Sequence, residues 1–287
     1  MTAFQSNYIT SKWFYLKQHR AFKEAPLNTI IRVLVWAMHC LLKIPAVIKI
    51  PQWDCKFYLP PKFRKAGSSG IYILRDKYES SLTYLDRFLE PNQTFIDGGA
   101  NFGIYTVAAS KIVGDSGNVL SFEPSVESFP VLERNVKLNE FSNVKLFNSA
   151  LSSEEGISRL YHIDNAPNSY SLNSDSKKST TFEEVSTKTL DGIVNHNNIQ
   201  KVDLIKLDVE GAEEEVLKGA KSLLLRDKPK VLFEIGSRNS SNISGDPQGA
   251  WNYLKQMDYR FFSIKSNGEL IELNSAPPAG NILAVCK

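Results

Sequence analysis

Short apolar runs and amphipathic segments alternate along the chain after residue 90. The apolar runs predict strands at residues 94–96, 118–122, 143–147, 202–207 and 230–235. The segments between them have helical periodicity, and they predict helices after residue 103 and at residues 126–139, 211–225 and 250–257. Strands that alternate with helices are typical of a parallel, doubly wound α/β sheet. We therefore expect that fold class.

The end of the predicted sheet differs from the rest. Two late strands, 259–264 and 281–285, have no long helix between them. This connection predicts one antiparallel edge strand in a mostly parallel, seven-stranded sheet. A polar stretch at 152–188 also interrupts the alternation, and it is too long for a plain loop. We expect short strands within it.

The start of the chain does not follow the alternation. Residues 1–70 predict a helical N-terminal extension, and the main domain is then expected at 71–287. Several prolines in the segment 45–61 predict an extended connector between the two parts. Residues 78–90 predict a further helix, which ends before a proline.

Residues 27–50 are the most apolar part of the extension. Arg32, His39 and Lys43 fall near one face of a predicted helix, which leaves a broad apolar face opposite. That face has two interpretations. It packs on the main domain or across a dimer interface, or it forms a peripheral contact with an anionic membrane. The pattern alone leaves both open.

Composition and charge narrow the class of protein. The chain is 42% hydrophobic and 23% charged, which are values of a globular protein. Its net charge is +3, but residues 1–50 hold seven Lys or Arg and one acid, Glu24, and therefore carry +6. A basic front end on a mildly acidic body favours contact with a surface, a lipid or a partner rather than with nucleic acid.

The three cysteines, Cys40, Cys55 and Cys286, are scattered and form no CxxC pair. This spacing argues against a disulfide framework or a zinc site and fits a reducing compartment. The first residues do not have the pattern of a secretory signal. We therefore expect a cytoplasmic protein that could lie against the inner face of the membrane.

The candidate chemistry begins at the segment Thr94–Thr106. Asp97 ends the first predicted strand, and a turn with Gly98, Gly99 and Gly103 leads into a helix. In an open α/β sheet, a nucleotide-like ligand binds at such a turn, outside the carboxyl end of the strand.

Three further features fall where a nucleoside needs them. Glu123 ends the second strand, where a carboxylate can accept hydrogen bonds from ribose hydroxyls. Residues 148–150 end the third strand, beside the expected position of adenine. Asn101 stands where a dinucleotide motif has its middle glycine, and Asp97 would repel a pyrophosphate. An acid there suits the ammonium and, more distantly, the sulfonium of S-adenosylmethionine, so we favour this cofactor over NAD.

Four segments of the chain, Asp97–Thr106, Phe122–Pro124, Asn148–Ser152 and Leu204–Glu213, resemble the FkbM-type family of S-adenosylmethionine-dependent methyltransferases. The resemblance covers about residues 92–287, and Gly98 departs from an aliphatic residue that is usual there. It implies a class I methyltransferase (Rossmann-like) fold and methyl transfer to hydroxyls of sugars, glycolipids or natural products. Together with the turn, it predicts a cofactor site formed by Asp97, Gly98, Gly99, Asn101, Gly103, Tyr105, Glu123, Pro124, Ser149 and Ala150.

The acids after the fourth strand are the candidate catalytic residues. Acids at 213–215 are explained by the start of a helix, where the dipole favours negative charge. Asp208 is not, because an acid that closes a buried strand must be hydrogen-bonded, paired or functional. We predict Asp208 as the base or the acceptor of the substrate hydroxyl, with Glu210 as its partner and Lys206 as an ion-pairing neighbour.

Three residues are weaker candidates for binding the acceptor. His162 and Ser169 lie in the polar interrupting stretch, and Glu234 ends the fifth strand. Carboxylates at 208, 210 and 234 would suit magnesium, but no His or Cys lies nearby, and we expect no metal.

We therefore expect an S-adenosylmethionine-dependent O-methyltransferase with a small-molecule or glycan acceptor that the sequence does not identify. Two alternatives stay open at this point. One is a nicotinamide-dependent oxidoreductase on the same type of sheet. The other is a non-catalytic adaptor whose N-terminal segment docks to a membrane or a partner.

Overall fold

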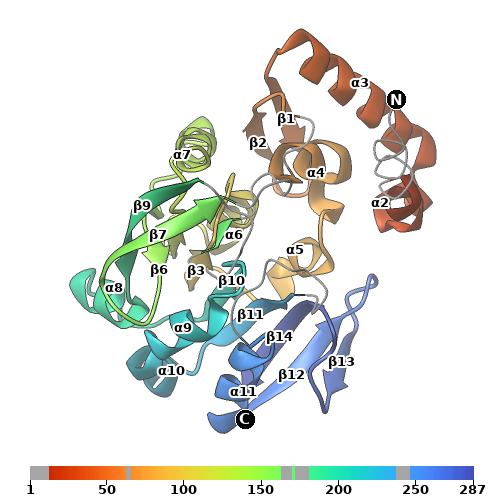
Figure 1. The fold of residues 1–287 in the computed structure, drawn as a ribbon. Helices are drawn as coiled ribbons and strands as arrows, with labels where there is room; N and C mark the ends of the chain where they lie inside the picture. The colour runs from red at the N-terminus through yellow and green to blue at the C-terminus, as the bar shows by residue number, and fades with distance from the viewer. Residues whose placement is uncertain (1–12, 63–65, 163–169, 172–180, 237–245) are drawn as a thin grey trace.

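A computed structural model describes residues 13–62, 66–162, 170–171, 181–236 and 246–287. Its centre is an eight-stranded sheet in the order β13-β12-β14-β11-β10-β3-β4-β5 (Figure 1). The strands are β3 (Thr94–Gly98), β4 (Asn118–Phe122), β5 (Val144–Phe147), β10 (Leu204–Leu207), β11 (Lys230–Ile235), β12 (Tyr259–Ile264), β13 (Leu270–Leu273) and β14 (Gly280–Cys286).

The strand directions confirm the predicted α/β class with a mostly parallel sheet. The five strands β5, β4, β3, β10 and β11 are parallel. Two details differ from the prediction. The reversed strand β14 lies between β11 and β12 rather than at the edge, because its apolar residues are buried and pair on both sides. The sheet has an eighth strand, β13, which pairs antiparallel with β12 and provides an antiparallel edge strand.

Both faces of the sheet are covered, as expected for apolar parallel strands. Successive residues of β3 point to opposite faces: Phe95 packs with α6 (Ile104–Val113), and Ile96 packs with the helices of the other face. Those helices are α8 (Leu190–His196), α9 (Glu213–Lys218), α10 (Lys221–Asp227) and α11 (Gly249–Gln256). The predicted helix at 211–225 is divided into α9 and α10 at Gly219, where only glycine fits, because a Cβ there would lie 2.2 Å from the carbonyl oxygen of Ser152.

The interrupting stretch contains strands, as predicted. A second sheet has the order β6-β9-β7-β8. Its strands are β6 (Ala150–Leu151), β7 (Gly156–His162), β8 (Tyr170–Ser171) and β9 (Phe182–Lys188). The predicted helix at 78–90 is shorter than expected and consists of α5 (Ser80–Thr83), with the 3-10 turns η1 (Arg75–Lys77) and η2 (Leu85–Arg87) on either side.

The N-terminal part is more ordered than a helix followed by an extended connector. It contains α2 (Arg20–Glu24), α3 (Pro26–Leu42), β1 (Ala46–Ile50), β2 (Cys55–Leu59) and α4 (Ala66–Leu74). The predicted connector is instead a β1–β2 hairpin, because its alternating apolar residues are buried in the same cluster as α6. The predicted boundary at residue 70 falls inside α4. Within the described chain, no helix is long and apolar enough to cross a membrane.

Two asparagines join the hairpin to the main domain. They lie one turn apart on α7 (Phe129–Leu138) and just after it, and they contact the outer edge of β2. Asn135 is buried, accepts from the backbone N–H of Tyr58 at 2.6 Å and donates to the carbonyl of Phe102 at 2.8 Å. Asn139 accepts from the N–H of Lys56 and donates to its carbonyl, both at 2.7 Å. These amides satisfy backbone groups that would otherwise lack partners.

This arrangement predicts that Asn135→Ala lowers the free energy of unfolding by about 2–4 kcal/mol, since two backbone groups lose their partner at a buried site. Asn139 is half-buried, so water can replace its amide, and we expect Asn139→Ala to cost about 1 kcal/mol. Urea titration followed by circular dichroism measures both. Equal losses in the two variants would contradict the assigned difference in burial.

Candidate active site

The turn after β3 brings the backbone of two strands into close approach. Gly99 has φ +75°, and a Cβ on it would lie 1.9 Å from the carbonyl oxygen of Asp208, which follows β10. Asn101 also has a positive φ, of 51°. Asparagine tolerates this left-handed conformation better than most residues. The backbone at Asn101 therefore adopts a conformation typical of glycine, although asparagine occupies the position at which a dinucleotide motif has its middle glycine.

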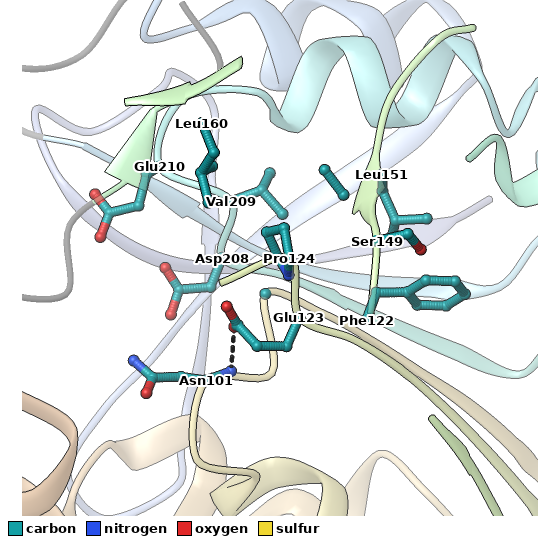
Figure 2. A pocket seen from close by; sticks show the side chains of 12 residues that line it. Asn101, Phe122, Glu123, Pro124, Ser149, Leu151, Leu160, Asp208, Val209 and Glu210 are labelled. Carbon is teal, nitrogen blue, oxygen red and sulfur yellow. Dashed lines mark hydrogen bonds between the residues drawn. The ribbon is translucent and has the colours of Figure 1, made fainter. Parts of the chain in front are cut away.

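A cavity opens in front of this turn. It lies where β4 and β11 continue the sheet in opposite directions from β3 and β10, the topological switch point at which α/β sheets bind ligands. Figure 2 shows Asp208 and Glu210 at one end of this cavity and Phe122 and Ser149 at the other.

Glu123 stands in the middle of the cavity, directly after β4. Its carboxylate accepts the backbone N–H of Asn101 at 2.7 Å (Figure 2) and that of Ser125 at 2.9 Å. Burial raises the pKa of Glu123 to about 7, although the two N–H donors oppose this shift. The protonation state of this carboxyl therefore changes close to neutral pH.

The other end of the cavity is largely apolar. Phe122 and Leu151 contribute to its walls. Ser149 adds a polar atom there, and its buried Oγ has no hydrogen-bond partner in the described part of the chain. The side-chain oxygen of Asn101, at the turn, is likewise buried and has no hydrogen-bond partner among the described residues. Two buried acceptors without partners beside one cavity are consistent with a ligand that supplies hydrogen bonds.

A second cavity adjoins the first and shares Gly99, Asn101 and Asp208 with it. Glu79, at the start of α5, also lines it. The Glu79 carboxylate accepts hydrogen bonds from the hydroxyl of Tyr105 at 2.7 Å and from the amide of Asn281 at 2.9 Å. Burial, followed by the charge of Asp208, raises the pKa of Glu79.

Lys206 is buried between these acids. Its Nζ lies 3.3 Å from Asp208 Oδ2 and 3.8 Å from Asp97 Oδ1, and 4.8 Å from the ring centroid of Tyr105. Burial disfavours its charge, but Asp208, Asp97 and Glu79 outweigh that effect and hold the pKa of Lys206 above its ordinary value. The predicted ion pair between Lys206 and Asp208 is therefore present.

Asp208 and Glu234 form a second acidic contact. The Glu234 side chain, on β11, shares a hydrogen bond with Asp208. Its pKa is raised to about 8, first by partial burial and then by the charge and the hydrogen bond of Asp208. The negative charge of Asp208 thus favours the protonated form of Glu234. The Asp208 side chain is 37% exposed, so a ligand in either cavity can reach it.

The structure places most of the predicted residues in these two cavities. Asp208 and Glu210 line the first one, together with six predicted cofactor residues: Gly99, Asn101, Glu123, Pro124, Ser149 and Ala150. Tyr105 lines the second cavity. The roles given to all of these residues stay predictions.

Three predicted cofactor residues lie beneath the glycine turn, outside the lining of the two cavities. Asp97 is fully buried and accepts the hydroxyl of Thr106 at 2.7 Å. A Cβ on Gly98 would lie 2.9 Å from the Leu207 side chain, and Gly103 is the N-cap of α6. Among the described residues, these three do not line either cavity. Their contact with a cofactor stays a prediction.

The three residues predicted to bind the acceptor lie in different parts of the chain. Glu234 contacts Asp208, as described above. His162 ends β7, and Ser169 lies outside the described residues. Across the described chain, no group of three or more His, Cys, Asp or Glu is arranged to hold a metal ion.

Glu79 is the main site residue that the sequence did not reveal. It precedes a short helix in a region with no strand signal, so nothing in the pattern places it beside β10.

Glu213 has the expected role at the start of a helix, since its carboxylate accepts the N–H of Val209 at 3.1 Å and of Gly211 at 3.3 Å.

The strand order, the glycine turn after the central strand and the acid after its neighbour define a class I methyltransferase fold. The profile of the methyltransferase FkbM domain matches residues 97–261. Because this match covers more than half of the chain, the protein belongs to the FkbM family of methyltransferases. The class and the family imply S-adenosylmethionine as the methyl donor.

Two methyltransferases are similar to this chain in sequence, and one solved structure overlaps with it. Methyltransferase sdnD from Sordaria araneosa is 29% identical over 197 residues, which cover 55% of this chain and 75% of that protein. Methyltransferase 1 from Beauveria bassiana (strain ARSEF 2860) is 28% identical over 148 residues, or 45% of this chain and 59% of that protein. The crystal structure of the methyltransferase FkbM from Methylobacillus flagellatus KT has a TM-score of 0.44 and 14% identity, and the match covers 89% of this chain and 59% of that chain.

The position of Lys206 predicts the effect of removing its charge. In Lys206→Met, buried carboxyls lose their cation, so their pKa values in the folded protein rise further above those of the unfolded chain. Stability is then retained at low pH and lost as pH rises. We expect a loss of about 3–5 kcal/mol near pH 8 and a smaller loss near pH 5, in urea titrations.

Lys201→Met is the matched control, because Lys201 pairs with Asp203 at 2.7 Å but its side chain is 65% exposed. We expect little change at either pH. A loss for Lys206→Met that is the same at both pH values would show that its charge does not balance the buried acids.

Proposed function

We propose that this protein is an S-adenosylmethionine-dependent O-methyltransferase that acts on a hydroxyl of a sugar, a glycolipid, a polysaccharide or a natural product. The observation that carries the proposal is the position of Asp208. Its carboxylate is accessible at the junction of the two cavities and lies next to one cation and one proton-sharing acid.

The first cavity fits the donor. Glu123 accepts the ribose hydroxyls, and Ser149 offers its unpartnered Oγ to the adenine edge between apolar walls. The backbone of Gly99 and Asn101 leads toward the second cavity, where the amino-acid end of the donor would lie among the acids. S-adenosylmethionine bound in this way supplies an activated methyl group. Asp97 contributes negative charge from beneath the turn.

The acceptor hydroxyl needs a group that takes its proton as the oxygen forms its new bond. Asp208 Oδ atoms are the best placed for this role, because they face both cavities. Lys206 Nζ, 3.3 Å away, compensates the negative charge, and Glu234 holds a proton at neutral pH because its pKa is about 8. Glu210, at the same end of the cavity, provides a second contact for the acceptor.

The two alternative functions, a nicotinamide-dependent oxidoreductase and a non-catalytic adaptor, lead to different experimental expectations. A nicotinamide cofactor would bring a pyrophosphate toward the acids of the turn, and the family match favours methyl transfer. A comparison of thermal shifts with S-adenosylhomocysteine and with NAD separates the two cofactors. A purely adaptor function would leave the protein without methyl transfer to any acceptor in a cell extract.

We predict that Asp208→Asn retains S-adenosylhomocysteine binding but lowers methyl transfer by about 10²–10⁴-fold, since the amide cannot take the proton. Transfer of a labelled methyl group to acceptors in a cell extract, read by mass spectrometry, measures the loss. Asp115→Asn, at an exposed loop residue, is the control and should not change the transfer. Undiminished transfer by Asp208→Asn would remove Asp208 from the mechanism.

A second prediction concerns pH. Ribose hydroxyls are bound by the ionised form of Glu123, whose pKa of about 7 in the free protein means that binding must release a proton at lower pH. The affinity for S-adenosylhomocysteine should therefore rise up to about tenfold between pH 6 and pH 8. Glu123→Gln should bind more weakly and with a flat pH profile in calorimetry. A wild-type profile that is already flat would exclude Glu123 as the ribose acceptor.

A further inference from the structure

Helix α3 presents an apolar face to solvent. Its outward residues recur at helical spacing, and all of them are exposed: Leu27, Ile31, Leu34, Val35, Met38, Leu41 and Leu42. The stripe continues past the helix through Ile44 and Val47, which are also exposed. Figure 1 shows α3 along an outer border of the molecule, beyond the β1–β2 hairpin and α4.

The opposite face of α3 carries its polar contacts and packs on the protein. Trp36 is buried, stacks on Tyr72 with ring centroids 4.8 Å apart and donates to Ser69 Oγ at 2.8 Å. Arg32 donates to the carbonyl of Ile73 at 3.2 Å. A surface helix normally turns its apolar stripe to the core. Here that stripe faces outward, so the packing of α3 on the rest of the chain does not explain it.

Exposed apolar side chains are concentrated in this region. Of the seventeen large apolar side chains that are exposed in the described residues, twelve lie between residues 13 and 47. Single exposed apolar residues are ordinary on protein surfaces, but a contiguous group marks an interaction site. Trp13 and Phe14 are among these twelve, and Trp is a residue that favours the boundary between lipid and water.

The charge around this apolar surface indicates its partner. Residues 25–53 contain no Asp or Glu; of their basic residues, Arg32 lies on the packed face of α3, Lys49 pairs with Asp54, and Lys43 lies beside the stripe. Lys43 is exposed at the C-cap of α3, next to the apolar stripe, and Lys17 is exposed beside the ring of Trp13. A second copy of the chain would bring the same positive charges against each other. Anionic lipid headgroups are complementary to them, and acyl chains are complementary to the stripe.

We propose that α3 binds the surface of an anionic bilayer and lies parallel to it, with its leucine-rich stripe among the upper acyl chains and Lys43 at the headgroups. The packed face of α3 stays on α4, so the protein covers one side of the helix while lipid covers the other. This attachment is independent of the reaction proposed above and is tested without an acceptor or a methyl donor.

Co-sedimentation of the full chain with lipid vesicles tests the proposal. Two compositions are needed: phosphatidylcholine alone, and phosphatidylcholine mixed with phosphatidylglycerol. We expect binding to the mixed vesicles that weakens with added salt, and weaker binding to the neutral ones. Lys43→Gln should reduce binding to the mixed vesicles about fivefold.

Leu34→Glu and Leu225→Glu form a matched pair, because the two leucines are 60% and 61% exposed and both lie on helices. Leu34→Glu should weaken binding to the mixed vesicles by at least about tenfold, and Leu225→Glu, on α10, should bind as the wild type does. Thermal melting by circular dichroism checks that both variants fold.

Three results would overturn the proposal. The first is a wild-type chain that stays in the supernatant with both kinds of vesicle. The second is equal loss of binding in the two glutamate variants. The third is a wild-type dimer in light scattering without lipid that Leu34→Glu converts to monomers, which would assign the apolar stripe to a second copy of the chain.

Discussion

The balance of charge around Lys206 is the constraint on which the site depends. Asp97, Asp208 and Glu79 approach one another in a region from which water is largely removed, and Lys206 is the cation among them. Breaking a buried ion pair leaves an uncompensated charge, which costs far more than the pair contributes. The acids can therefore be assembled beside the cavities only because this lysine is held in place.

The sheet holds it in place through register. Parallel pairing sets Lys206 opposite Asp97 across β10 and β3, and the period of two along an extended segment puts Lys206 and Asp208 on the same side. Gly99 then allows the turn to contact the backbone of Asp208. Strand register, turn conformation and electrostatics thus specify the same geometry, so the site cannot shift without disturbing the centre of the sheet.

The sequence reveals those parts of this arrangement that are encoded locally. Asp97, Glu123 and Asp208 each end an apolar run, and an acid in that position indicates the functional edge of a parallel sheet, which is where the structure has them. Glu79 and Asn281 meet from opposite ends of the chain, and no local pattern encodes that contact. The β1–β2 hairpin was missed because its prolines indicate a connector, whereas its alternating apolar residues bury against α6. The direction of the α3 stripe depends on Trp36 packing on Tyr72, which also requires the fold.

The contact between α7 and β2 shows how a helix can take the place of a neighbouring strand. Residues four apart on a helix are separated by about 6 Å along its axis, and residues two apart on a strand by about 6.7 Å. The amides of Asn135 and Asn139 therefore match the spacing of Tyr58 and Lys56, and each resembles a peptide group in its donor and acceptor. An open strand edge is a template for aggregation. At these two positions the side chains of the helix pair with the open edge of β2, so the hairpin can remain two-stranded beside a much larger sheet.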